Sequence, residues 1–430
     1  MIKNLLKKHD LNLANLLMCA YLVIAPIDYV LVLPFKELAI INAIILMLLV
    51  LNFIKLIKWI VRTIKNRTSI KIAVLSVRDR LYPDSASKSV IAFATLFYLY
   101  YCVSNIIEIF YFRTYSPDFK FILYGALFLF LFTYQYSEVD FKLFKGAIEI
   151  SCYVLAMTCI IKLIFDSQTF DSFEMARSVD PNYFACGFII CTAYMSRMIC
   201  KGKNLILNLV SLNIVMFYII RSGSRGGFLA NVAVIGLSFL PYLLKSPRVF
   251  WSVATSAIIL ALVVSFSYPA TADRFDISNL GTGSGRTIIW GNYLYSLTAA
   301  PLENIFFGVG RDFETYIYLA KEWSGILPHN MYLKLFIGGG LLGFPLFIVL
   351  LTLLVYYSAK NTNPFAWIVI VGLIFAGMTL DMDTTRDFYL FLAVGMIYGV
   401  QLNNRKKQFE SPLKLPEENK TLLKKILDLI

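Results

Sequence analysis

Long apolar stretches, each about 17 to 25 residues, recur along the whole chain between shorter polar segments. A helix of that length spans the hydrocarbon core of a bilayer, which is roughly 30 Å thick. The pattern therefore predicts an all-α polytopic membrane protein with about 12 transmembrane helices and no separate soluble domain. The predicted spans are 11–33, 38–60, 90–112, 119–136, 145–165, 182–200, 204–220, 228–244, 249–269, 330–357, 364–380 and 387–402.

Lys and Arg residues are distributed unevenly over the segments between these spans. With the N-terminus inside, about 23 lie on cytoplasmic segments, about 10 on external segments and about seven within spans. The positive-inside rule then places both termini in the cytoplasm. Residues 1–402 form the predicted transmembrane domain, and 403–430 form a basic cytoplasmic tail that ends in an amphipathic stretch, Leu422–Ile430.

Composition agrees with this interpretation. Hydrophobic residues make up 58% of the 430 residues and charged residues only 16%, which is more apolar than a soluble core requires. The net charge of +13 lies mostly in the 61–88 segment and the 403–430 tail, where it faces anionic headgroups. The positive charge therefore gives no reason to expect a nucleic-acid partner.

One predicted external segment, about 270–328, is far longer than the others. Long ordered loops usually carry function, and this one has the pattern of a small helical cap over a cavity, between the ninth and tenth spans. Its features are a glycine-rich turn (Gly281, Gly283, Gly285), a helix-compatible stretch from Thr287 to Leu297, a break at Pro301 and Gly308, and a second helical stretch near Asp312 to Trp323.

Three cationic residues stand at span boundaries or in loops on the predicted outer side: Arg225 in RSGSRGG, Arg286 in GTGSGRTIIW and His329 in PHNMYLKLFIGGG. Guanidinium groups near lipid are costly unless paired, and their planar fork matches phosphate oxygens. In RSGSRGG, the double glycine would expose backbone amides at the start of the span 228–244, which also favours an anion. We therefore expect an anion site, with a diphosphate as its ligand.

Each of these residues also has a simpler interpretation. Arg225 could cap a helix or reach the interface, with the glycines only permitting a turn. Arg286 could be a solvated residue at the head of a surface helix. His329 could be structural, with Asn330 as the N-cap of the next helix. Only two histidines occur in the chain, so a histidine-rich metal cluster is excluded.

Other motifs favour structural roles. Asp381 and Asp383 have the spacing of a metal-binding Asp-x-Asp pair, but a short link between two spans is rich in such turn residues. Asp180 and Asn182 favour a turn and N-cap. Four glycines of the tenth span predict close helix packing or a kink rather than a nucleotide loop, and Lys334 is expected to reach the interface. These glycines are Gly338, Gly339, Gly340 and Gly343.

Four of these pieces occur in an order that resembles the O-antigen ligase and polymerase superfamily of bacterial envelope polysaccharide assembly: DPNYFA, RSGSRGG, GTGSGRTIIW and HNMYLKLFIGGGLLG. The resemblance covers roughly residues 180–345. It implies a glycosyltransferase of the C-type membrane fold that uses no metal or other cofactor. Its donor would be an undecaprenyl-diphosphate-linked oligosaccharide, at the outer leaflet of the plasma membrane.

By this resemblance, His329 takes the proton from the acceptor hydroxyl, and Arg225 and Arg286 hold the diphosphate. Arg221 and Arg386 are implied as weaker phosphate or sugar contacts. Membrane lipids, a chain-length regulator and a flippase of the same pathway are implied as further partners.

Three alternatives stay open. Polymerization of lipid-linked repeat units is favoured by the GSGRTIIW and DPN signatures, but transfer to the lipid A core, the ligase reaction, uses the same site. A secondary transporter would show an acidic relay near the bilayer midplane and related halves, and the sequence has neither feature. A flippase for the same lipid would also use arginines, but it needs no base.

Overall fold

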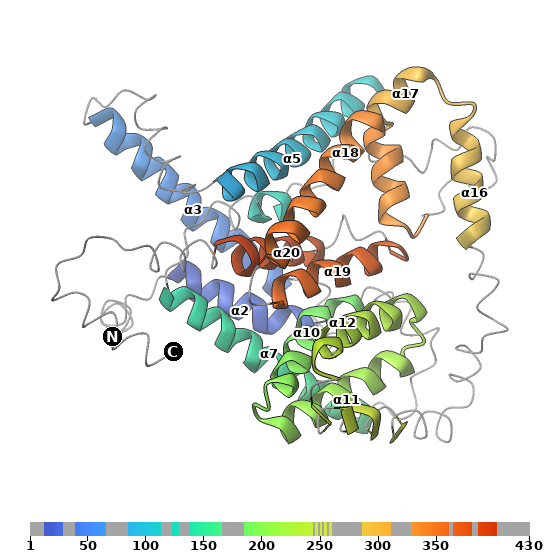
Figure 1. The fold of residues 1–430 in the computed structure, drawn as a ribbon. Helices are drawn as coiled ribbons and strands as arrows, with labels where there is room; N and C mark the ends of the chain where they lie inside the picture. The colour runs from blue at the N-terminus through green and yellow to red at the C-terminus, as the bar shows by residue number, and fades with distance from the viewer. Residues whose placement is uncertain are drawn as a thin grey trace.

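The computed structural model describes residues 13–28, 39–65, 85–112, 123–128, 138–165, 185–243, 246–247, 250–251, 253–255, 258–259, 286–310, 328–360, 364–380 and 386–401. Regular structure in these residues is helical, and no strand occurs among them. The elements are α2 (Leu13–Asp28), α3 (Ala39–Lys65), α5 (Ser85–Phe112), α7 (Glu138–Phe165), α10 (Ile189–Cys200), α11 (Leu205–Arg221), α12 (Arg225–Leu243), α16 (Arg286–Leu297), α17 (Leu302–Phe307), α18 (Met331–Ala359), α19 (Phe365–Gly377), α20 (Arg386–Val394) and the π-helix η5 (Gly395–Gln401) (Figure 1).

The helices lie where the apolar runs predict them. The stretch expected from Thr287 to Leu297 is α16, and the predicted breaks at Pro301 and Gly308 flank the short helix α17. The second stretch of the long loop, Asp312 to Trp323, and the tail 403–430 lie outside the described residues. The prediction of an all-α chain is confirmed for the part of the chain that the structure describes.

Two helical segments, Phe141–Ile164 and Met331–Ala359, are long and apolar enough to cross a membrane by length and composition. Shorter apolar helices of 10–17 residues accompany them, among them Leu205–Arg221 and Phe365–Gly377. The number of twelve spans stays a prediction.

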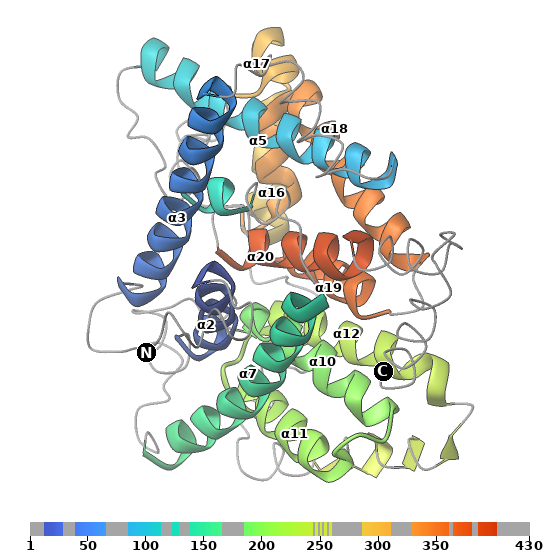
Figure 2. The same cartoon turned by 90° about the vertical axis from the view of Figure 1, so that its left-hand side faces the viewer.

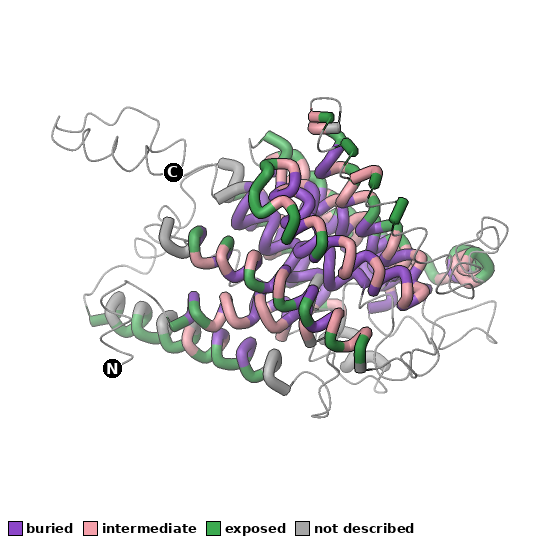
Figure 3. The backbone as a smooth tube through the Cα atoms, turned by 90° about the horizontal axis from the view of Figure 1, so that it is seen from below, coloured by how far each residue is buried: buried purple, intermediate pink, exposed green. Residues whose placement is uncertain are grey.

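Large apolar residues are exposed along several helices. Exposed residues, in green, alternate with buried ones along these helices in Figure 3. On α3 the exposed apolar residues recur every three or four residues, so they form a stripe along one continuous helix face. A soluble protein rarely exposes so long an apolar face, whereas lipid accepts it. The stripe on α3 consists of Leu46, Met47, Val50, Phe53, Ile54, Ile57, Ile60, Val61 and Ile64, and the one on α7 of Ile150, Val154, Met157, Ile161 and Ile164.

The helices pack in two neighbouring groups that meet at α19. In one group, α2 packs along α7, and α10 contacts α7, α11 and α12 (Figure 2). In the other, α18 lies against α5 and α17. Helix α19 contacts α10 and α12 from the first group and α18 from the second. Residues from both groups can therefore lie beside α19.

Helix α18 consists of two helices that meet at a kink. Gly340 has φ 61° and ψ −164°, so residues 331–339 and 341–359 run in different directions (Figure 1). The kink leaves carbonyl groups without helical donors, and neighbouring segments supply them. Val309 N–H donates to Ile337 O at 3.0 Å, Gly310 N–H donates to Gly338 O at 3.0 Å, and Tyr100 Oη donates to Gly339 O at 3.0 Å.

The glycines around the kink permit these contacts. A side chain at Gly340 would overlap the backbone of Phe306 and Gly308, and one at Gly339 would overlap the Tyr101 ring. Gly340 also has a positive φ, which L side chains rarely adopt. The prediction that these glycines serve close packing or a kink is confirmed, and both features are present.

Candidate functional site

The RSGSRGG segment is a tight turn between α11 and α12. Arg221 ends α11, and Gly223 adopts φ 68°, a conformation that favours glycine. Ser224 is the N-cap of α12, because its Oγ accepts from Gly227 N at 3.1 Å and its carbonyl accepts from Phe228 N at 3.0 Å. The turn therefore fixes Arg225 as the first residue of α12.

The two glycines after Arg225 serve helix packing. Both are buried, and a side chain at Gly226 would overlap Thr379 just beyond α19, while one at Gly227 would overlap Ala185. The Gly227 amide already donates to Ser224 Oγ. The missing side chains let α12 approach its neighbours. The expectation that this pair exposes its amides to an anion is wrong for Gly227, whose amide is occupied by Ser224, and stays a prediction for the Gly226 amide.

A buried asparagine holds the start of α12 in place. Asn231 Nδ2 donates to Ala185 O and to Gly227 O, both at 2.8 Å, and its Oδ1 accepts from Thr192 Oγ1 at 2.8 Å. A fully buried amide with all these bonds is a rigid link. It ties α12 to the segment that follows the DPNYF sequence and thereby positions Arg225.

Arg286 is the first residue of α16 and is partly buried. Its Nη1 donates to the Thr379 carbonyl oxygen at 3.0 Å, across 93 residues of chain. This bond is inconsistent with a merely solvated loop arginine. A guanidinium has five N–H donors in a planar fork, and the bond to Thr379 uses one of them.

His329 precedes α18 in a strained backbone conformation. Its φ is 46°, which is uncommon for a residue other than glycine and is frequent at functional sites. Asn330 is the N-cap predicted from the sequence, since its Oδ1 accepts from Tyr332 N at 3.0 Å and from Leu333 N at 3.1 Å. Trp290 of α16 donates from Nε1 to Pro328 O at 2.6 Å, which ties α16 to the segment that carries His329.

The C-terminal end of α19 brings these segments together. Thr379 contacts the start of α12 through Gly226 and the start of α16 through Arg286. The start of α18 reaches the same end, because Met331 fills the space beside Gly377 and Tyr332 Oη donates to Ile374 O at 2.9 Å.

The starts of α12, α16 and α18, which carry the three predicted basic residues, thus lie near the C-terminal end of α19. Arg225 begins α12, Arg286 begins α16 and His329 stands two residues before α18. Helix N-termini carry partial positive charge, and guanidinium forks bind oxyanions bidentately. The arrangement favours a ligand with several negatively charged oxygens.

The structure gives less detail for the other residues that the sequence predicts at the site. Arg221 is partly buried at the end of α11, four residues before Arg225. Arg386 begins α20, but its side chain lies outside the described part. Asp180, Asn182, Asp381 and Asp383 also lie outside the described residues, so their roles stay predictions.

Three residues of this region are not evident from the sequence pattern. Thr379 has no motif, although it stands two residues before the DMDTTRD segment. Trp290 closes GTGSGRTIIW, and its indole N–H could have signalled a buried partner. Lys334 was expected to reach the membrane interface, but that prediction is wrong: the side chain is 7% exposed and is enclosed by protein.

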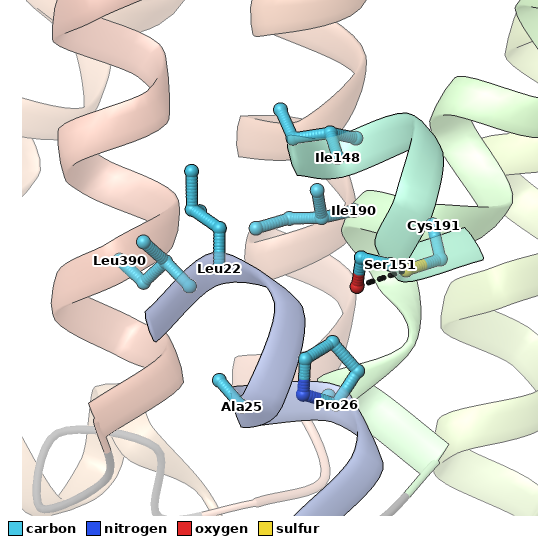
Figure 4. Close-up of a pocket in the computed structure, with 9 residues that line it drawn as sticks. Leu22, Ala25, Pro26, Ile148, Ser151, Ile190, Cys191 and Leu390 are labelled. Atoms are coloured by element: carbon cyan, nitrogen blue, oxygen red, sulfur yellow. Dashed lines mark hydrogen bonds between the residues drawn. The ribbon is translucent and has the colours of Figure 1, made fainter. Parts of the chain in front are cut away.

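A small apolar cavity lies elsewhere, between α2, α7, α10 and α20 (Figure 4). Leu22, Pro26, Ile190 and Leu390 line it, and its main polar contact joins Ser151 Oγ and Cys191 Sγ at 3.6 Å. It includes none of the cationic residues. The cavity has no groups suited to an anion.

Fold and site together define a helical membrane protein with a cationic centre built from helix ends. Residues 210–348 match the family described as O-antigen ligase. The match includes RSGSRGG, GTGSGRTIIW and the segment that starts α18, so the resemblance to the O-antigen ligase and polymerase superfamily is confirmed. The family consists of membrane glycosyltransferase-like enzymes of surface polysaccharide synthesis. A comparison with curated proteins found no match.

Proposed function

We propose that this protein is a polysaccharide polymerase that joins undecaprenyl-diphosphate-linked oligosaccharide repeat units at the outer leaflet of the bacterial plasma membrane. An acceptor hydroxyl attacks the anomeric carbon of the donor sugar, and a new glycosidic bond forms. The bond from that carbon to the diphosphate oxygen breaks, and the lipid diphosphate leaves with the electron pair. The acceptor proton passes to His329.

The observation that supports this proposal is that the helix starts carrying Arg225, Arg286 and His329 lie near the end of α19. Two guanidinium groups from different helix starts suit the two phosphates of one diphosphate. Preorganized cationic donors stabilise the charge that develops on the leaving group, and this is usually the largest contribution to such a reaction. His329 lies just before a third helix start, that of α18, and would take the acceptor proton.

The same arrangement requires no metal ion. The donor already carries a diphosphate leaving group, and the arginines supply the positive charge that a metal would otherwise supply. The competing interpretation assigns a metal to Asp381 and Asp383. Treatment with a chelator separates the two: full activity supports the proposal, and loss of activity restored by a divalent cation contradicts it.

A ligase is the closest alternative, since it uses the same donor and differs only in the acceptor. The glycans of a deletion strain distinguish the two. A single repeat unit still attached to lipid A means that polymerization is lost. Unattached polymer on its lipid carrier means that the ligase step is lost, and it overturns the polymerase assignment.

A flippase of lipid-linked glycans could also use arginines for the diphosphate, but it has no need for a base. His329→Ala should then leave polymer synthesis largely intact. The glycosyltransferase proposal predicts severe loss of polymer while the variant is still present in the membrane at normal amounts.

A further inference from the structure

Helix α17 exposes large apolar side chains, although it lies in the long segment that the sequence places outside the membrane. Leu302 is 70% exposed, Phe307 is 59% exposed, and Phe306 is exposed as well. Exposed apolar groups of this kind mark contact surfaces. The contacts of α17 with α18 and α5 indicate which partner covers this one.

Helix α17 lies directly against the kink of α18 (Figure 1). A Cβ atom built on Gly340 would come within 2.5 Å of the Phe306 carbonyl oxygen. Leu341 and Leu342 follow the kink within one turn, and both are exposed. Apolar side chains of both helices are therefore exposed on either side of the same contact.

A second contact joins α17 to α5. Tyr100 Oη donates to the Phe307 carbonyl oxygen at 2.9 Å and to the Gly339 carbonyl oxygen at 3.0 Å. The exposed residues of α5 near Tyr100 recur every three or four residues, so they form one apolar helix face. These residues are Leu96, Leu99 and Val103. The exposed face of α17 is thus bordered by exposed apolar residues of two long helices.

The part of α18 after the kink has the length and surface of a membrane span. At 1.5 Å per residue, residues 341–359 extend about 28 Å, close to the roughly 30 Å of the hydrocarbon core. They contain no charged residue, and large exposed side chains recur along them as far as Tyr356. The ammonium group of Lys360 lies over the Tyr356 ring at 4.1 Å from its centroid, a pair typical of the membrane–water boundary. With that boundary at one end, the kink and α17 lie at the opposite one.

The one charged residue of α17 agrees with this depth. Glu303 is exposed in the first turn of the helix. In the hydrocarbon core its carboxylate would be costly, whereas at the boundary it reaches the headgroups and water. A short helix with an apolar exposed face and one carboxylate is therefore suited to the boundary and not to the core.

We propose that the exposed face of α17 lies in the outer leaflet of the membrane, where lipid acyl chains cover Leu302, Phe306 and Phe307. A solvated cap would leave these side chains in water, whereas the bilayer covers the adjoining faces of α5 and α18. The partner of this surface is the lipid itself, and α17 is an anchor at the membrane boundary.

The anchor is connected to the segment that carries the proposed base. Val309 and Gly310 follow α17, and their N–H groups donate to Ile337 O and Gly338 O, both at 3.0 Å. These carbonyls belong to the first part of α18, which begins two residues after His329. The membrane contact thereby helps to fix the position of that histidine. Only the catalytic meaning of this link rests on the proposed function.

Fluorescence quenching by brominated lipids tests the contact. Full-length Phe307→Trp is reconstituted in phosphatidylcholine vesicles whose acyl chains carry bromine either near the headgroup or near the methyl end. The wild type has five tryptophans, so the signal is the increase over the wild type. A side chain about 5–10 Å below the headgroups should be quenched at least about twofold more strongly by the shallow bromines than by the deep ones.

Two control positions calibrate the depth. Ile348→Trp lies on the exposed face of α18, about 12 Å along the helix from the kink, and should be quenched more by the deep bromines. Lys203→Trp lies in the exposed turn between α10 and α11 and should be quenched by neither lipid. Leu302→Trp provides a second position on α17. Loss of folded protein in both α17 variants means that these side chains pack against protein, and it overturns the proposal.

The other outcomes are equally decisive. If acrylamide quenches the added tryptophan and neither lipid does, α17 lies in water as a cap, and the proposal is overturned. Resistance to acrylamide and to both lipids means that protein, such as a second copy of the chain, covers the face, and this also overturns it. Stronger quenching by the deep bromines contradicts the boundary position. None of these results depends on glycosyl transfer, so failure here is distinct from failure of the proposed function.

Discussion

Alanine at position 226 would test how closely the start of α12 must approach the end of α19. A Cβ atom built on Gly226 lies 2.7 Å from Thr379 Cβ and closer still to the hydroxyl. Carbon atoms pack at about 3.5–4.0 Å, so the two segments would have to separate by about 1 Å. Thr379 is branched at Cβ and stiff, so the helix ends have to move apart.

Both stability and activity should respond. Overpacking of this kind costs about 1–3 kcal/mol of folding free energy. The same shift moves Arg225 away from Arg286, and a misplacement of about 1 Å in a catalytic arrangement can lower the rate on the order of 100-fold. We expect Gly226→Ala to be recovered in the membrane with glycan transfer reduced to about a hundredth of wild type.

The assay is transfer by purified protein in proteoliposomes, with thermal unfolding measured on the same samples. Gly236→Ala is the matched control, because the new methyl group on the same helix meets nothing within 4 Å. Thr379→Gly in the Gly226→Ala background removes the obstructing side chain and keeps the carbonyl that Arg286 bonds, so activity should return. Activity of Gly226→Ala equal to that of Gly236→Ala, or no recovery in the double variant, would refute the packing argument.

Three further substitutions test the surroundings. Arg286→Lys keeps the charge but loses the fork, so it cannot bond Thr379 and a phosphate in the same geometry; the transfer rate should fall about 10- to 100-fold, and wild-type rates would contradict a diphosphate contact. Asn330→Ala removes the cap of α18 and should lower stability by about 1 kcal/mol in thermal unfolding, whereas Asn330→Asp should retain most of it; equal stability of the two would contradict a capping role. Gly340→Ala places a side chain at φ 61° against Phe306 and should greatly reduce folded protein in size-exclusion chromatography, unlike Gly291→Ala, which meets nothing within 4 Å; equal recovery would contradict the strained kink.

The helix positions follow closely from the sequence, because membrane helices must satisfy their backbone hydrogen bonds internally and therefore occupy long apolar runs. The cap at Asn330 was also predictable, since it depends on residues only two and three positions away. The glycines around Gly340 indicated either packing or a kink. The segment that packs against Gly340 is α17, and the local sequence gives no indication of this contact.

The site was predictable in its residues but not in its connections. Arg225, Arg286 and His329 stand out as basic residues at helix boundaries. Thr379, which links two of those boundaries, lies 93 residues from Arg286 and has no motif of its own. The role of the Gly227 amide was misassigned for the same reason. A glycine can permit either an exposed amide or a close neighbour, and tertiary packing decides which of the two occurs.

Lys334 shows a related limit. A lysine near the end of an apolar span is usually expected to extend toward the headgroups. Here the kink at Gly340 shortens the first part of α18, and α16 packs beside it, so position 334 is enclosed by protein. Burial of this kind results from tertiary packing and cannot be inferred from hydropathy along the chain.

The central claim is that this centre performs glycosyl transfer with His329 as the base and without a metal ion. The most direct test is transfer of a lipid-linked repeat unit by purified protein in proteoliposomes containing excess chelator, for the wild type and for His329→Ala. We predict transfer at the full rate by the wild type and loss of about 100-fold or more in the variant, which should still bind farnesyl diphosphate. Transfer by His329→Ala at the wild-type rate, or dependence of the wild type on an added divalent cation, would contradict this account.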